Sequence, residues 1–255
     1  MRRLVAVAVA AVALCAAGAT ASSAQAPGGR IIVQFAQPRN ADERVLTSLL
    51  RAAQLPQVFT ELSKHLKLPR NIFIRVQGGQ DGPYYNPQTR TIILNHPFSA
   101  LVINVFAKEY PNITQYRLGE LFAELEYFVL FHELGHALVD QWDLPVVGRE
   151  EDAVDAFSTI FMTKFVNNGE FALAGADFFY YLAGTHKLDE VDFADEHSFD
   201  KQRAYSIACW VYGSNTTRYG YLRKVLPAGR RVRCADEYRR LEKAWLSFLR
   251  PHIKP

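Results

Sequence analysis

The segment 125–139, LEYFVLFHELGHALV, decides how this chain folds, because it reads as a helix that is apolar on nearly every side. His132, Glu133 and His136 stand as polar groups within this apolar helix. Residues four apart project from one face of a helix, so the two imidazoles can hold one ion while Glu133 stands beside it. The segment therefore predicts a buried helix that carries a metal site, and the spacing suits one zinc ion per chain.

A hydrogen-bonded polar face on an ordinary helix is the alternative interpretation of this motif. Chance matches usually lack a third ligand, whereas a catalytic zinc site has three protein ligands and an open position. The segment 148–158, GREEDAVDAFS, places Glu151 and Asp155 four residues apart at the start of the next helix. Glu151 would ligate the ion, and Asp155 would accept a ring N–H from a ligating histidine, with His132 as first choice. An acidic cluster favoured only by the helix dipole remains the alternative.

The pattern along the chain predicts an α+β fold. With 49% apolar and 22% charged residues, the 255-residue chain can bury a substantial core, and we expect one domain over residues 27–255. Strand-like runs at 31–35, 72–78 and 89–97 surround a helical run at 42–66 that is interrupted near Pro56. From about residue 115 the pattern is helical almost throughout, over 117–142, 150–166, 170–188, 199–213 and 234–249. A small N-terminal sheet followed by a mostly helical C-terminal half is the expected architecture.

Residues 1–26 have the features of a secretory signal peptide: two arginines, a short apolar run and a small-residue Ala-Gln-Ala site. An uncleaved anchor is the alternative. Cleavage would leave 27 basic against 26 acidic residues and no stable membrane span. This balance gives no electrostatic reason to bind nucleic acid or anionic lipid, so we expect a secreted or periplasmic protein without a nucleic-acid partner.

The cysteines support the same compartment. Cleavage of the signal would remove Cys15 and leave Cys209 and Cys234 where thiols oxidise. We expect a disulfide between them, with two unpaired buried thiols as the alternative.

HELGH followed by a helix with Glu four residues before Asp resembles the gluzincin metallopeptidases. More narrowly, the chain is similar to a bacterial family of unknown function known only as "putative metallopeptidase". The segments that carry this likeness are VLFHELGHALVDQWDLPVVGREEDAVDAF, YYNPQTRTIILN and EHSFDKQRAYSIACWVYG. The resemblance implies a zincin-like fold with His132, His136 and Glu151 as zinc ligands and Glu133 as base. It implies no particular substrate, and only 14 residues separate His136 from Glu151, a tight connection for a gluzincin.

The chemistry of such a site assigns further roles. Zinc lowers the pKa of a bound water, and Glu133 takes the water's proton and later passes it to the leaving amine. The oxyanion needs another donor, for which the candidates are His197, Arg203 and Tyr205. We choose His197, although a surface or capping histidine is the alternative. The run 89–95, TRTIILN, is either an edge strand that an extended peptide joins or an ordinary strand within the sheet.

Three functions remain open at this point. The first is a secreted zinc peptidase that acts on peptides or proteins. The second is a catalytically idle envelope protein in which zinc has a structural role, and the third is a zinc hydrolase of a cell-wall amide. Glu133 favours an enzyme, because a structural zinc site has no use for a base beside the metal. The sequence fixes neither the cleavage specificity nor the oligomeric state.

Overall fold

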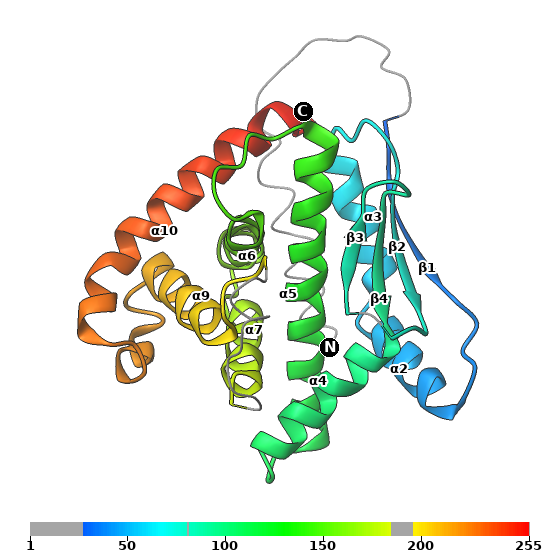
Figure 1. The fold of residues 1–255 in the computed structure, drawn as a ribbon, viewed down its shortest axis with the longest axis horizontal. Helices are drawn as coiled ribbons and strands as arrows, with labels where there is room; N and C mark the ends of the chain where they lie inside the picture. The colour runs from blue at the N-terminus through cyan, green and yellow to red at the C-terminus, as the bar shows by residue number, and fades with distance from the viewer. Residues whose placement is uncertain (1–27, 81, 185–195, 255) are drawn as a thin grey trace.

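The computed structural model describes residues 28–80, 82–184 and 196–254, so the predicted signal peptide lies outside the described residues. Helix α5 (Gln115–Trp142) stands in the middle of the molecule. The sheet lies on one side of it and the later helices on the other (Figure 1). The predicted α+β class is confirmed.

A four-stranded sheet forms the N-terminal side, and its strands are β1 (Ile31–Phe35), β2 (Ile72–Gln77), β4 (Thr91–Asn95) and β3 (Tyr84–Asn86), in that spatial order. The first three run parallel, and β3 pairs antiparallel with β4. Helices α2 (Ala41–Ala52) and α3 (Leu55–His65) form the crossover between β1 and β2. They separate at Gln54, whose φ of 62° interrupts the helix just before the predicted break at Pro56.

Two elements differ from the sequence prediction. No strand was expected between the predicted strands 72–78 and 89–97, but the short strand β3 lies there and pairs with β4 through register partners such as Tyr85 and Ile92. The predicted strand 89–97 ends at Asn95, whose side chain caps helix α4 (His96–Glu109) by accepting a hydrogen bond from Phe98 N. Since β4 lies between β2 and β3, the TRTIILN run is an interior strand, and its possible role as an edge strand is wrong.

The C-terminal half is helical, as predicted. It contains α6 (Glu150–Ile160), a π-helical turn η2 (Phe161–Phe165), α7 (Glu170–Leu182), α9 (Asp200–Ser214), the 3₁₀ turn η3 (Gly220–Lys224), α10 (Ala228–Leu249) and the 3₁₀ turn η4 (Arg250–His252). Helix α10 starts six residues before the predicted run, after Pro227, a residue suited to a helix start. The predicted disulfide is confirmed, because Cys209 of α9 is bonded to Cys234 of α10.

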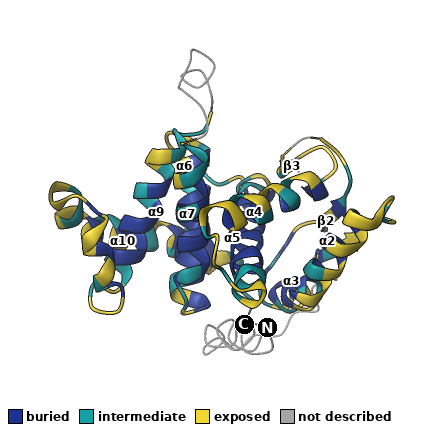
Figure 2. Ribbon diagram, turned by 90° about the horizontal axis from the view of Figure 1, so that it is seen from below, coloured by how far each residue is buried: buried dark blue, intermediate teal, exposed yellow. Residues whose placement is uncertain are grey.

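Helix α5 is buried along most of its length, as its apolar sequence predicts. Thr114 caps its first turn, and Asp143 ends it in the left-handed conformation. Phe128, Leu130 and Leu134 are fully buried, and each stabilises the fold by about 1.5–3 kcal/mol relative to exposure. Figure 2 shows α5, α7 and α9 as the dark, buried interior. Among the described residues, no helix is long and apolar enough to cross a membrane.

Candidate metal centre

Helices α5 and α6 pack closely enough to bring the HELGH motif and the acidic cluster together. Gly135 lies inside the motif, and a Cβ atom there would stand 2.8 Å from the side chain of Val154. That contact is too short for packed carbon atoms, so a larger residue at position 135 would push α6 away. The glycine thus sets the distance at which Glu151 and Asp155 face the histidines of α5.

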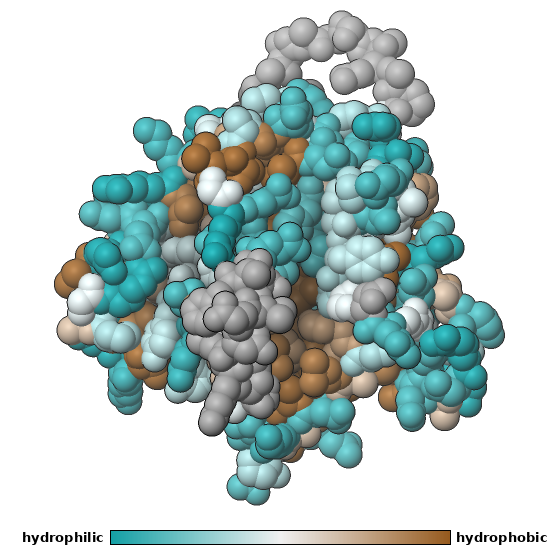
Figure 3. Space-filling view, in the orientation of Figure 1, coloured by the Kyte–Doolittle hydropathy of each residue, from teal (hydrophilic) through white to brown (hydrophobic). Residues whose placement is uncertain are grey.

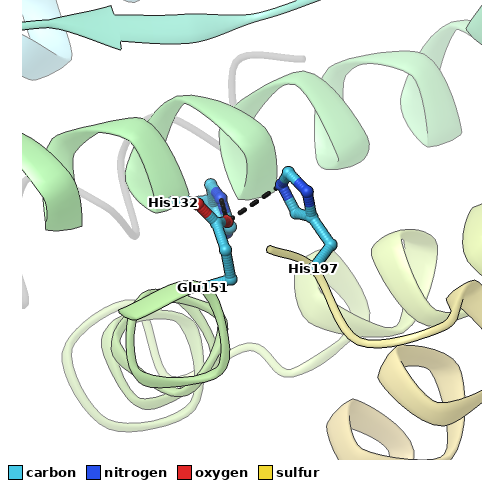
Figure 4. A group of neighbouring side chains, drawn as sticks. All are labelled: His132, Glu151 and His197. Atoms are coloured by element: carbon cyan, nitrogen blue, oxygen red, sulfur yellow. Dashed lines mark ion pairs between the residues drawn. The ribbon is translucent and has the colours of Figure 1, made fainter. Parts of the chain in front are cut away.

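The carboxylate of Glu151 lies where three imidazoles converge. Its Oε2 atom is 3.1 Å from His132 Nε2 and 3.0 Å from His197 Nε2 (Figure 4). Its Oε1 atom is 3.1 Å from His136 Nε2. Ligand atoms of His132, Glu151 and His197 all lie within 4.8 Å of one another. This His-Glu-His cluster could bind a metal ion, since imidazole nitrogens and carboxylate oxygens are common metal ligands.

One atom of the cluster fits a cation particularly well. Glu151 Oε2 is buried and makes no hydrogen bond with any described residue, although two imidazole nitrogens lie beside it. A buried carboxylate oxygen without a partner costs about 1–3 kcal/mol or more. A cation bound by His132, Glu151 and His197 would give this oxygen a partner. The residues present therefore fit a bound metal.

A second layer of charges orients His132. Asp155 Oδ1 lies 2.8 Å from His132 Nδ1, which leaves Nε2 directed at Glu151. Arg203 in turn donates two hydrogen bonds to Asp155, at 2.8 and 2.9 Å, and its guanidinium lies over the ring of Phe179. All of these side chains are buried or nearly so. This series of hydrogen bonds, from Arg203 on α9 through Asp155 on α6 to His132 on α5, holds the His132 ring in a single orientation.

His136 has a separate partner. Glu150 Oε1 lies 2.7 Å from His136 Nδ1, so each histidine of the motif has a carboxylate on the nitrogen that faces away from Glu151. The sequence analysis did not predict this role for Glu150. The adjacent acidic residues of α6 thus contact opposite nitrogens of the His136 ring: Glu151 lies at Nε2, inside the cluster, and Glu150 lies at Nδ1, outside it. The Glu150 side chain is about half exposed, unlike Asp155.

The charges of the cluster follow from these contacts. Burial alone would lower the pKa of His136, but Glu151 and Glu150 raise it to about 9. Burial would raise the pKa of Glu151, but the three imidazoles hold it far below its usual range. Burial would likewise raise the pKa of Asp155, yet Arg203 and His132 lower it. The two carboxylates are therefore held ionised beside imidazoles that keep their protons, and a metal ion bound there would replace those protons.

Glu133 lies beside the cluster in an open cleft. The cleft has a volume of about 670 Å³, and its lining includes Glu133, the three imidazoles and the edge strand β3 with Tyr84 and Tyr85. Figure 3 shows the same face, where hydrophilic side chains border the hollow between the sheet and the helices and apolar atoms appear at its lower end. Burial raises the pKa of Glu133. The cleft is large enough for several residues of an extended peptide.

The three candidate oxyanion donors occupy different places. Among the described residues, His197 lines the cleft, whereas Arg203 and Tyr205 do not. Arg203 is buried behind the cluster, where it holds Asp155, and Tyr205 packs against the ring of Tyr180. Of the three, only His197 faces the space in which a substrate would lie.

A His-Glu-His cluster beside a further carboxylate at an open cleft defines a candidate metalloenzyme. Comparison with known families gives a match over residues 35–249 to the DUF4344 family, described as "Putative metallopeptidase". The match covers most of the chain, so this protein belongs to that family. No curated protein and no solved structure matched it.

Proposed function

We propose that this protein is an exported zinc-dependent metallopeptidase that cleaves peptide bonds. The orphaned Oε2 atom of Glu151 carries the proposal, because it lies among imidazole nitrogens at the edge of the cleft that also contains Glu133. His132, His136 and Glu151 would hold the ion. Bound there, zinc would lower the pKa of a water molecule and polarise the carbonyl under attack.

The side chains around the ion would share the remaining work. Glu133 would accept the proton of the attacking water and deliver it to the leaving amine, and its raised pKa supports that exchange. Asp155 and Glu150 would keep the Nε2 atoms of His132 and His136 directed at the ion. The ring N–H of His197, when turned into the cleft, would donate to the oxyanion of the scissile carbonyl.

Strand β3 supports a peptide as the substrate. It is the edge strand nearest to the centre, and Tyr84 and Tyr85 line the same cleft as the cluster. An extended peptide could pair with the free edge of β3 through main-chain hydrogen bonds, which do not depend on sequence. The interior strand β4 cannot offer such an edge.

Export is part of the proposal and has separate support. The disulfide between Cys209 and Cys234 is typical of proteins that leave the reducing cytosol. The composition of residues 1–26 suits a secretory signal.

A structural zinc centre is the second candidate, and one observation favours it. His197 brings a fourth possible ligand to within 3.0 Å of Glu151, and closed sites with four protein ligands are typical of structural zinc. Glu133 argues for the enzyme, because a structural site needs no carboxylate beside the ligands and facing a cleft.

Replacing Glu133 by Gln separates the two candidates. If Glu133 is the base, zinc content and melting temperature should barely change, while cleavage of a peptide library should fall about 10²–10⁴-fold. Glu120→Gln, on the same helix but away from the cleft, is the matched control and should keep full activity. Wild-type cleavage should also stop with a chelator and return with zinc. Retained cleavage in Glu133→Gln, with stability lowered by about 1–3 kcal/mol, would contradict the peptidase.

A further inference from the structure

Contacts of the His197 backbone and of the neighbouring Ser198 hold the segment that carries His197 at the cluster. Arg149 Nη1 donates a hydrogen bond to His197 O at 2.7 Å, and Ser198 Oγ donates one to Asp152 Oδ1 at 2.7 Å. Arg149 and Asp152 flank Glu151 at the start of α6. The turn that supplies the central carboxylate therefore also fixes the segment that carries His197. These two contacts would not be needed if His197 lay beside Glu151 only by accident.

The imidazole of His197 is directed at the same atom as that of His132. Both Nε2 atoms lie about 3 Å from Glu151 Oε2, the atom that lacks a hydrogen bond. Figure 4 shows the ring of His197 directed at this carboxylate, with the ring of His132 beside it. An oxyanion donor would instead direct its N–H into the cleft, toward the carbonyl under attack. In this structure His197 occupies the position of a ligand.

Exposure distinguishes His197 from the other three residues. Its side chain is 38% exposed, against 6% for His132, 16% for His136 and 11% for Glu151. The rings on α5 cannot leave without disturbing the buried packing of that helix. His197 instead lies on the segment before α9 and lines the cleft, so its ring has open space on one side.

We infer that His197 is a displaceable fourth ligand, which closes the metal centre in the resting protein and leaves it when a peptide occupies the cleft. The inference rests on the proposed function and adds a form of regulation to it. A catalytic zinc site needs an open position, and four protein ligands leave none. One Nε2–metal bond would break, and the freed position would become available to water. The released imidazole would then face the oxyanion.

Counting the imidazole ligands of the zinc-loaded protein by X-ray absorption tests this directly. We expect three imidazoles in the wild type and two in His197→Ala, each with one zinc per chain. His65→Ala, which removes a histidine from α3, is the control and should still give three. Two imidazoles in the wild type would overturn the inference while leaving the proposed function intact. A wild type that binds no zinc would instead contradict the proposed function.

Acetohydroxamate, a small zinc-chelating probe, provides a second measurement. A closed centre must open before the probe binds, so the apparent affinity falls by the fraction of open molecules. His197→Ala should therefore bind acetohydroxamate at least about tenfold more tightly than wild type. Ser198→Ala, which removes one anchor but keeps the imidazole, should give an intermediate affinity. Unchanged or weaker binding in both variants would overturn the inference.

Discussion

Helix α5 buries carboxylates at two places, and their surroundings differ. At residues 132–136, Glu133 lies among imidazoles that each have a carboxylate partner and that converge on Glu151. Near its start, the same helix buries Glu124 and Glu126. Arg117 reaches Glu124 at 3.3 Å, whereas the carboxyl of Glu126 is fully buried with only the hydroxyl of Ser99 beside it among the described side chains. Neither of these two side chains lines the cleft.

The comparison shows that burial of a carboxylate does not by itself mark a functional site. Glu126 and Glu133 are seven residues apart and so project from the same face of α5. Burial raises the pKa of Glu126 to about 8, and it raises the pKa of Glu133 as well. What distinguishes Glu133 is its neighbours, because the ligand atoms beside it converge on one point that opens to solvent. Convergence, rather than a perturbed pKa, identifies the metal centre.

The largest expected effect comes from breaking this convergence. Replacing His132 or His136 by Ala should remove the bound zinc and with it all cleavage, because two protein ligands of the motif act together on one ion. Metal analysis of the purified variants measures the loss. Glu126→Ala on the same helix should keep one zinc per chain. Full zinc occupancy in both histidine variants would exclude this site.

The second buried carboxyl of the comparison, Glu126, predicts that a substitution at its position increases the stability of the protein. Glu126 has a pKa of about 8 in the folded protein and about 4.5 when unfolded, so the folded state holds a proton that the unfolded state releases between these values. The contribution of Glu126 to the free energy of unfolding is therefore fully present below about pH 4.5 and is lost as pH rises toward 8. From pH 5 to pH 8 this loss amounts to roughly 3 kcal/mol.

Glu126→Gln removes the titration and should be more stable than wild type at pH 8, with a much smaller difference at pH 5. Urea unfolding of both proteins at the two pH values measures this difference in the free energy of unfolding, because the other titratable groups contribute equally in the two proteins. Glu120→Gln, one turn and a half earlier with a more exposed carboxylate, should show no such pH-dependent difference. An equal effect of Glu126→Gln at both pH values would mean that Glu126 finds a partner when ionised.

The residues that sequence alone could place are those linked by helical spacing. His132, Glu133 and His136 lie on one turn, and Glu151 and Asp155 are one turn apart on the next helix, so local geometry suffices to group them. The approach of His197 to Glu151, 46 residues away, depends on how α9 packs against α6 and has no local signal. The role of Glu150 depends on the orientation of a single ring and could not be predicted either.

Two elements were missed, one with a local signal in the sequence and one without. Asn95, with Pro97 two residues later, is typical of the start of a helix. The strand pattern before Asn95 was extended through these residues, so α4 was not predicted. Strand β3 is only three residues long and lies among turn formers, so its pairing with β4 has no periodic signal. This error matters for function, because β3 is the edge that borders the cleft.

The smallest effects should come from the two carboxylates behind the histidines, which offer a matched pair. Asp155→Asn keeps the shape but loses the charge that orients His132, so zinc affinity should fall about 10- to 100-fold. Glu150→Gln removes the corresponding charge behind His136 at a position that is about half exposed, where water can replace the lost contact. Its effect should be smaller, about 3-fold, because solvent screens an exposed charge.

Competition with a chelator of known zinc affinity measures both variants under one condition. Asp155 also holds Arg203 through two hydrogen bonds, so its replacement leaves a buried guanidinium with a weaker partner and should lower stability as well. A double variant, Asp155→Asn with Arg203→Met, removes that unpaired charge. If the loss of zinc affinity persists in the double variant while stability recovers, Asp155 acts on the metal through His132. If affinity recovers together with stability, the carboxylate serves only the fold, and the order predicted for the two carboxylates is wrong.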